Sequence, residues 1–185
     1  MTSSNTWKRS EARSAKRIGS VRTPLSGSNG KLTASDSLSG YWFMENKLKA
    51  TVTLFNMFHT VYDMAKHRKK EPLMIFFSKG EKYAVFSVKK FYLTTNMHLP
   101  RYDSLFDGNW YIDMQYNEMM PYRHLYIKTA EKAAKEKKVP IVIIHKKGMQ
   151  IDIGIMELSL FLSHLPSLPA VITVPEAIAA RKVKQ

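Results

Sequence analysis

The chain contains no cysteine among its 185 residues. Without thiols it can form no disulfide bond, no cysteine-ligated zinc or iron–sulfur site, and no thiolate nucleophile. It also has no apolar run close to the eighteen or so residues that a membrane-spanning helix requires. No apolar segment of the kind found in secretory signals lies near the start. These absences favour a soluble protein of a reducing compartment or of a virus particle.

The motifs that most enzymes need are also missing. Neither a glycine-rich phosphate loop nor a dinucleotide-binding fingerprint is present, and no serine lies in a nucleophile elbow. The histidines do not occur in pairs with metal-ligand spacing; they are His59, His67, His98, His124, His145 and His164. We therefore expect no enzymatic activity and no catalytic, cofactor or metal site.

Acidic residues are scarce relative to basic ones. The chain has 29 Lys and Arg but only 15 Asp and Glu, which gives a formal net charge of +14. A protein of this size with such an excess is expected to bind a polyanion, either nucleic acid or an acidic membrane surface.

The composition divides the chain into two parts. Residues 1–40 are rich in Ser, Thr and Gly and carry seven basic residues against two acidic ones. Such a segment has too little apolar surface to offset the entropy lost on ordering, so we predict a disordered basic arm over 1–40. Residues 41–185 have the aromatic and aliphatic content of a globular domain.

The first half of this domain shows clear local patterns. Residues 50–54 alternate as in a strand, and apolar residues over 55–65 recur at helical spacing. The runs 73–77 and 83–88 read as strands, and Ser78 to Glu81 between them has hairpin-turn chemistry. These two strands are predicted to pair antiparallel.

The second half adds further elements. We predict a strand over 110–114, a solvated helix over 128–138 and a buried strand over 139–144. Apolar residues alternate over 149–162 with a one-residue phase slip, which predicts a long strand with a β-bulge near Ile155 and Met156. A short strand over 170–174 and a C-terminal helix follow, and no internal repeat is evident. The expected fold is α+β: a compact antiparallel sheet with two or three helices, preceded by the arm.

Basic residues gather in the arm and at the end of the helix predicted over 55–65. The helix dipole already favours cations at such an end, so a solvated helix end is the simpler interpretation there. Together with the arm, this cluster nevertheless favours a polyanion-binding surface. The predicted contacts are Lys8, Arg9, Arg13, Lys16, Arg17, Lys66, Arg68, Lys69 and Lys70.

The order of these elements resembles the matrix proteins of rhabdoviruses, especially the short ones of plant-infecting cytorhabdoviruses. The matching stretches are KATVTL, FHTVYDMA from Phe58, KYAVF from Lys82, MPYR from Met120, and the run from Lys147 to Phe161. The chain departs from animal-virus members in having no P-P-x-Y or P-[ST]-A-P motif. Its arm is also rich in Ser and Arg and has no lysine run.

The resemblance implies a structural role without cofactors. Such a protein self-associates as a homo-oligomer, condenses the viral ribonucleoprotein (the nucleocapsid) and links it to the anionic inner face of the envelope during budding. Its implied partners also include an envelope glycoprotein tail and RNA. Its implied location is the virion beneath the envelope, and in the host the cytoplasm, peripheral membranes and nucleus.

Two other functions explain the charge equally well. The chain could be a basic RNA-binding or ribosome-associated protein, or a viral movement or silencing-suppressor protein. Self-association separates the matrix interpretation from both alternatives, whereas charge alone does not.

Overall fold

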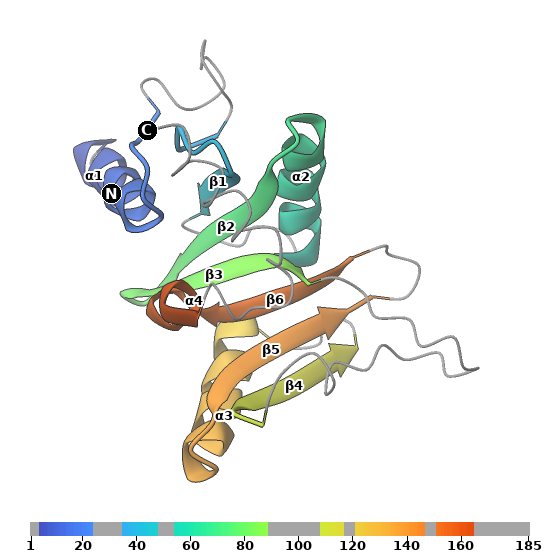
Figure 1. Cartoon of the computed structure of the whole chain (residues 1–185). Coiled ribbons are helices and arrows are strands. Elements are labelled where there is room, and N and C mark those ends of the chain that lie inside the picture. The colour runs from blue at the N-terminus through green and yellow to red at the C-terminus, as the bar shows by residue number, and fades with distance from the viewer. Residues whose placement is uncertain are drawn as a thin grey trace, which may run out of the picture.

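The computed structural model describes residues 4–23, 35–47, 54–88, 108–116, 121–146 and 151–164. In these ranges it has four helices and one six-stranded sheet, which confirms the α+β class. The elements in chain order are α1 (Ser4–Arg17), β1 (Trp42–Lys47), α2 (Leu54–His67), β2 (Glu71–Ser78), β3 (Glu81–Val88), β4 (Trp110–Tyr116), α3 (Tyr122–Lys135), β5 (Val139–His145), β6 (Asp152–Glu157) and α4 (Leu158–His164) (Figure 1).

The sheet is mixed, which corrects the prediction of an antiparallel sheet with two or three helices. Its strand order is β1-β2-β3-β6-β5-β4. The four central strands pair antiparallel, but β1 is parallel to β2, and β4 is parallel to β5. The chain makes each parallel pair by crossing over through a helix, α2 in one case and α3 in the other, because parallel neighbours need such a connection.

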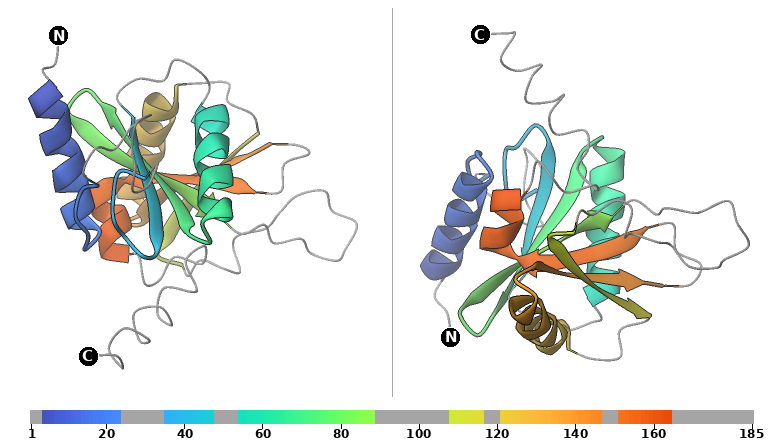
Figure 2. Two further views of the ribbon diagram at one scale, coloured as in Figure 1. Left: turned by 90° about the horizontal axis from the view of Figure 1, so that it is seen from above. Right: turned by 60° about the horizontal axis from the view of Figure 1, so that its bottom comes forward.

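Helices cover both faces of the sheet. Side chains of α2 and α3 share one hydrophobic cluster, which includes Phe58, Val85 and Tyr126. Ala15 of α1 and Phe161 of α4 belong to a second cluster on the opposite face. The two views of Figure 2 show α1 and α2 on different sides of the strands. This three-layer arrangement fixes where the charged helix surfaces lie.

The central hairpin agrees with the sequence prediction. Strands β2 and β3 pair antiparallel up to Ser78 and Glu81, and Lys79 and Gly80 form the two-residue turn. Both turn residues have positive φ, 49° and 85°, as a hairpin turn compatible with strand twist requires. The predicted helix over 55–65 and the strand over 139–144 are also present, as α2 and β5.

Other elements differ from the prediction. Strand β6 ends at Glu157 and α4 begins at the next residue, so the phase slip near Ile155 marks a change from strand to helix and no bulge. Leu158 and Phe161 are three apart and both buried, as on one face of a helix. Helix α3 starts six residues before the predicted helix over 128–138. Residues 50–53 and 170–174 of the predicted strands lie outside the described residues.

Residues 4–17 form α1, where the sequence suggested a disordered arm. The buried side of this helix is polar and small, with Glu11, Ser14 and Ala15 at most 3% exposed. The Arg22 Nε donates to a Glu11 carboxylate oxygen at 2.5 Å, which compensates the buried charge. Ala15 belongs to the hydrophobic cluster on this face of the sheet and Ile18 packs against it, so tertiary contacts hold α1 to the rest of the fold. Residues 24–34 of the predicted arm lie outside the described part.

The two halves of the sheet are built alike, which corrects the expectation of no internal repeat. Each half runs strand, helix, strand, strand, and α2 and α3 begin at Leu54 and Tyr122, which are 68 positions apart. The same spacing separates identical residues in equivalent places. These are Trp42 and Trp110, Ala65 and Ala133, Lys69 and Lys137, Lys70 and Lys138, Pro72 and Pro140, and Ile75 and Ile143.

The backbone repeats together with the sequence. Lys69 and Lys137 both lie just after their helices with positive φ, 54° and 55°. The following residue in each half donates its N–H to the carbonyl of the equivalent alanine, Ala65 or Ala133, at 3.0 and 2.9 Å. Each helix end is therefore closed by the same motif.

The halves meet around a local two-fold axis between β3 and β6. Val85 pairs with Ile155 at the centre of this antiparallel contact. The start of each helix reaches the hairpin of the other half: the Arg123 Nε donates to the Glu81 carboxylate at 3.0 Å, and the Lys146 ammonium lies 5.2 Å from the centre of the Phe55 ring. The arrangement is that of a dimer whose two subunits are fused in one chain.

Candidate polyanion-binding surfaces

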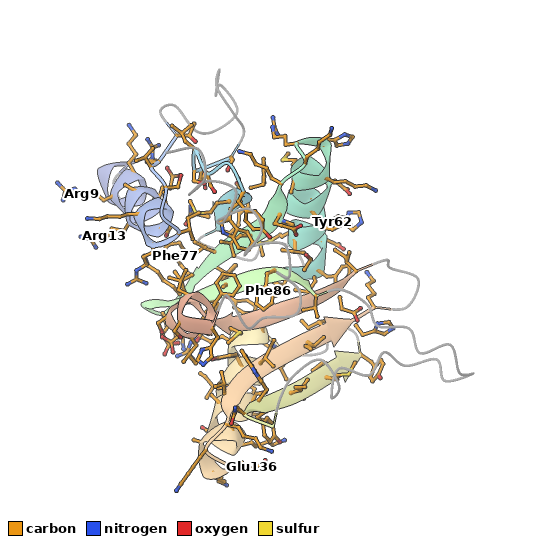
Figure 3. All side chains as sticks on the ribbon, in the orientation of Figure 1. Arg9, Arg13, Tyr62, Phe77, Phe86 and Glu136 are labelled. Atoms are coloured by element: carbon orange, nitrogen blue, oxygen red, sulfur yellow. The ribbon has the colours of Figure 1, made fainter. Side chains whose placement is uncertain are left out.

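Helix α1 presents one face that is entirely basic. Arg9, Arg13 and Arg17 are four residues apart, so their side chains form a stripe along the helix, and Lys8 and Lys16 lie next to it. All five side chains are exposed. Figure 3 shows Arg9 and Arg13 directed away from the sheet. At 1.5 Å per residue the stripe is about 12 Å long.

Lys82 of the central hairpin extends this face, although the sequence analysis did not select it. Its ammonium lies 4.8 Å from the centre of the Phe77 ring. Burial, with the nearby guanidinium groups of Arg17 and Arg13, holds the pKa of Lys82 below its usual value. The proximity of these three cations has no local sequence signal, because Lys82 is 65 positions after Arg17. We call Lys8, Arg9, Arg13, Lys16, Arg17 and Lys82 the α1 surface.

No carboxylate compensates the α1 surface in the described part of the chain. The one acidic residue of the helix, Glu11, lies on the buried side and is paired with Arg22. None of the six basic side chains has an ion pair with a described residue. Each pair of like charges four residues apart on a helix lowers the stability of the helix by a few tenths of a kcal/mol. The fold tolerates this repulsion, and a bound polyanion would relieve it.

The second predicted group forms the end of α2. Lys66, His67, Arg68 and Lys69 are exposed there, and the Arg68 guanidinium lies 5.4 Å from the centre of the Phe43 ring. Lys70 is directed inward: its ammonium donates to the Ser39 carbonyl at 2.5 Å. Burial and the neighbouring Arg68 lower the pKa of Lys70. Lys70 therefore has a structural partner, and we define the α2 end as residues 66–69.

The equivalent end of α3 provides a comparison within the same molecule. Ala134, Lys135 and Glu136 stand there in the places of Lys66, His67 and Arg68. The Glu136 carboxylate accepts a hydrogen bond from the Lys138 ammonium at 2.8 Å. Because the backbone closes both helices identically, the excess charge of the α2 end is not a requirement of the fold.

The α1 surface and the α2 end are separate. Helices α1 and α2 cover opposite faces of the sheet. The α2 end leads into Glu71 at the start of β2, whereas Lys82 follows the hairpin at the other end of this strand. Eight strand residues span about 23 Å. The structure thus distributes the predicted contacts over two surfaces, and one flat partner cannot cover both.

One histidine–carboxylate pair of the described residues has a structural place in the sheet. His145 Nδ1 lies 2.9 Å from the buried Asp152 carboxylate, and this pair occupies the place that Phe77 and Lys82 take in the first half. Within the described ranges no group of three or more His, Asp or Glu side chains could hold a metal ion. No helix among the described residues has the length and apolar character to cross a membrane.

Comparisons with known proteins identify no relative. No protein-family model matches the chain, and neither a curated protein nor a solved structure matches it.

Proposed function

We propose that this chain is a non-enzymatic structural protein of the matrix type, which binds a viral ribonucleoprotein and attaches it to the inner face of an anionic envelope membrane. In this proposal it self-associates in the virion beneath the envelope. The observation that supports it best is the presence of two basic surfaces on different sides of one sheet. A protein with this arrangement can hold two polyanions at once.

The α1 surface suits the phosphates of the ribonucleoprotein. Three of its six cations are arginines, whose planar guanidinium groups bind phosphate oxygens through two hydrogen bonds. The stripe of about 12 Å can contact several successive phosphates of a strand. An exposed stripe of lysines and arginines contacts phosphates mainly through charge, so the binding is expected to depend strongly on salt and only weakly on sequence.

The test is RNA binding by the full chain and by the variant Arg9→Gln, Arg13→Gln, Arg17→Gln. For single-stranded RNA, each phosphate contact adds about 0.7 to the slope of log affinity against log salt. Loss of three contacts is expected to lower that slope by about 2. The affinity for RNA at low salt should fall by a factor of ten or more.

A matched control removes the same charge from another helix. Lys128, Lys132 and Lys135 are exposed on α3 and lie on the solvated side. The variant with Gln at these three positions should keep the salt slope of the unmodified protein within about 0.5. Equal losses in both triple variants would mean that net charge alone governs RNA binding, and the α1 surface would then have no special role.

The alternative function is RNA binding without a membrane role. The α1 surface supports that function equally well. Flotation with vesicles separates the two: a chain that holds RNA but never floats with anionic vesicles is an RNA-binding protein and not a matrix protein.

A further inference from the structure

Large apolar side chains are exposed close to the α2 end. In the described part of the chain four such residues are exposed, and three of them are Val21 at 62%, Leu38 at 45% and Met64 at 42%. Met64 lies in the last turn of α2. Figure 2, left, shows the molecule from above the view of Figure 1.

Hydrogen bonds attach the segment with Val21 and Leu38 to Lys70, the residue that follows the α2 end. The Leu38 N–H donates to the Val21 carbonyl at 3.0 Å, and the next carbonyl along the chain, that of Ser39, accepts the Lys70 ammonium at 2.5 Å. The segment with Val21 and Leu38 is therefore attached to the turn that follows α2. Apolar groups and cations share one end of the molecule.

This combination favours a lipid surface over RNA. Apolar side chains gain by entering the acyl boundary of a bilayer, while lysine stems extend their ammonium groups to the headgroups. RNA phosphates offer no such apolar contact.

The equivalent end of α3, in the second half of the chain, shows which residues the same backbone carries where we propose no docking surface. Met64, Lys66 and Arg68 correspond to Lys132, Ala134 and Glu136. The apolar group is replaced by a charge, and two cations are replaced by a neutral and an acidic residue. Both the exposed methionine and the excess charge therefore belong to the first half alone.

We propose that the α2 end, with Val21 and Leu38, is the docking surface for an anionic membrane. Met64 and Leu38 enter the headgroup boundary, and Lys66, Arg68 and Lys69 contact anionic headgroups. This assignment rests on the proposed function, which requires one surface for lipid, and it leaves the α1 surface to the ribonucleoprotein.

The experiment is flotation of the full chain with vesicles of phosphatidylserine and phosphatidylcholine, beside vesicles of phosphatidylcholine alone. The test variant is Lys66→Ala with Arg68→Glu, since equivalent positions of α3 already carry these residues on the same backbone. Each basic residue near an anionic surface contributes about fivefold to partitioning. A change of three charge units should lower partitioning into anionic vesicles between tenfold and about a hundredfold, with RNA affinity changed less than threefold.

The matched control is Lys132→Ala with Lys135→Glu on α3, which changes the net charge by the same amount. It should lower vesicle partitioning less than threefold. A second test variant, Met64→Lys, adds charge but should still weaken flotation severalfold at physiological salt, because it removes an apolar contact.

Three results would overturn the assignment. The first is an equal loss of flotation in both charge variants, and the second is stronger flotation of Met64→Lys. The third is a loss of RNA affinity in Lys66→Ala with Arg68→Glu while flotation is retained, which would make the α2 end an RNA site. If no form of the chain floats with anionic vesicles, the membrane part of the proposed function fails as well, whereas the RNA measurements on the α1 surface are independent of it.

Discussion

Asp36 is a buried carboxylate that makes stability depend on pH. It is 6% exposed, and one carboxylate oxygen accepts the Asn46 backbone N–H at 2.7 Å and the Asn46 side-chain amide at 3.1 Å. Burial and the nearby Glu45 raise the pKa of Asp36 to about 6 from 3.8, against the effect of these hydrogen bonds. The folded protein thus binds the Asp36 proton more tightly than the unfolded chain does.

The sign of the effect follows from proton linkage. Between pH 3.8 and about 6 the folded state holds more protons at this site, so the free energy of unfolding falls as the pH rises through this range. At about 1.4 kcal/mol per pKa unit, the total loss is about 3 kcal/mol and is complete by about pH 7. Well below pH 3.8 the Asp36 carboxyl is protonated in both the folded and the unfolded state, and it then has no effect on how the free energy of unfolding depends on pH.

The perturbation is Asp36→Asn, whose carbonyl oxygen can accept the same hydrogen bonds from Asn46 without a charge. We expect the variant to be more stable than the unmodified protein by 1 to 3 kcal/mol at pH 7.5 and by less than about 1 kcal/mol at pH 4. The assay is urea unfolding of both proteins at half-unit steps from pH 4 to 8. Titrating groups that do not interact with Asp36 cancel in the difference, which leaves Asp36 and its neighbours Glu45 and Glu11. A difference that stays constant over this range would refute the argument.

Two further substitutions test the packing. Arg22→Ala leaves Glu11 buried without this partner, so we expect the free energy of unfolding to fall by about 3 kcal/mol. Urea denaturation measures this change. A loss below about 0.5 kcal/mol would mean that the ion pair does not hold α1. In Gly154→Ala the new Cβ would lie 2.6 Å from the Phe86 ring, which should cost about 1 to 3 kcal/mol. The same substitution made in a Phe86→Leu background should cost less, and an unchanged cost would contradict the predicted clash.

Local patterns were sufficient for the central strands. The hairpin of β2 and β3 was predictable because two short apolar runs flank a Lys-Gly turn, and both signals are local. Strand β5 was predictable from its run of buried aliphatic residues. In contrast, Met156, Leu158, Leu160 and Leu162 alternate as in a strand, while Leu158 and Phe161 are spaced as on one face of a helix. The end of β6 could therefore not be placed from periodicity alone.

The missed features depend on contacts between distant residues. The described buried residues of helix α1 are Glu11, Ser14 and Ala15, which give no hydrophobic signal of their own, and their contacts with the core cluster and Arg22 lie outside the helix. The repeat is carried by widely spaced identities, such as Trp42 and Trp110, that became recognisable once the backbones were compared. The basic residues themselves were predictable, whereas their division into two surfaces required the three-layer fold.

The most direct test of the account is flotation of labelled RNA with anionic vesicles, with the protein as the only link between them. The account predicts that RNA floats when the unmodified protein is present and stays at the bottom without it. The variant Arg9→Gln, Arg13→Gln, Arg17→Gln should still float with the vesicles but leave the RNA at the bottom. With the variant Lys66→Ala, Arg68→Glu, the protein and the RNA should both stay at the bottom, bound to each other. If either variant carries RNA to the vesicles as well as the unmodified protein does, the two surfaces do not have separate roles and the account is wrong.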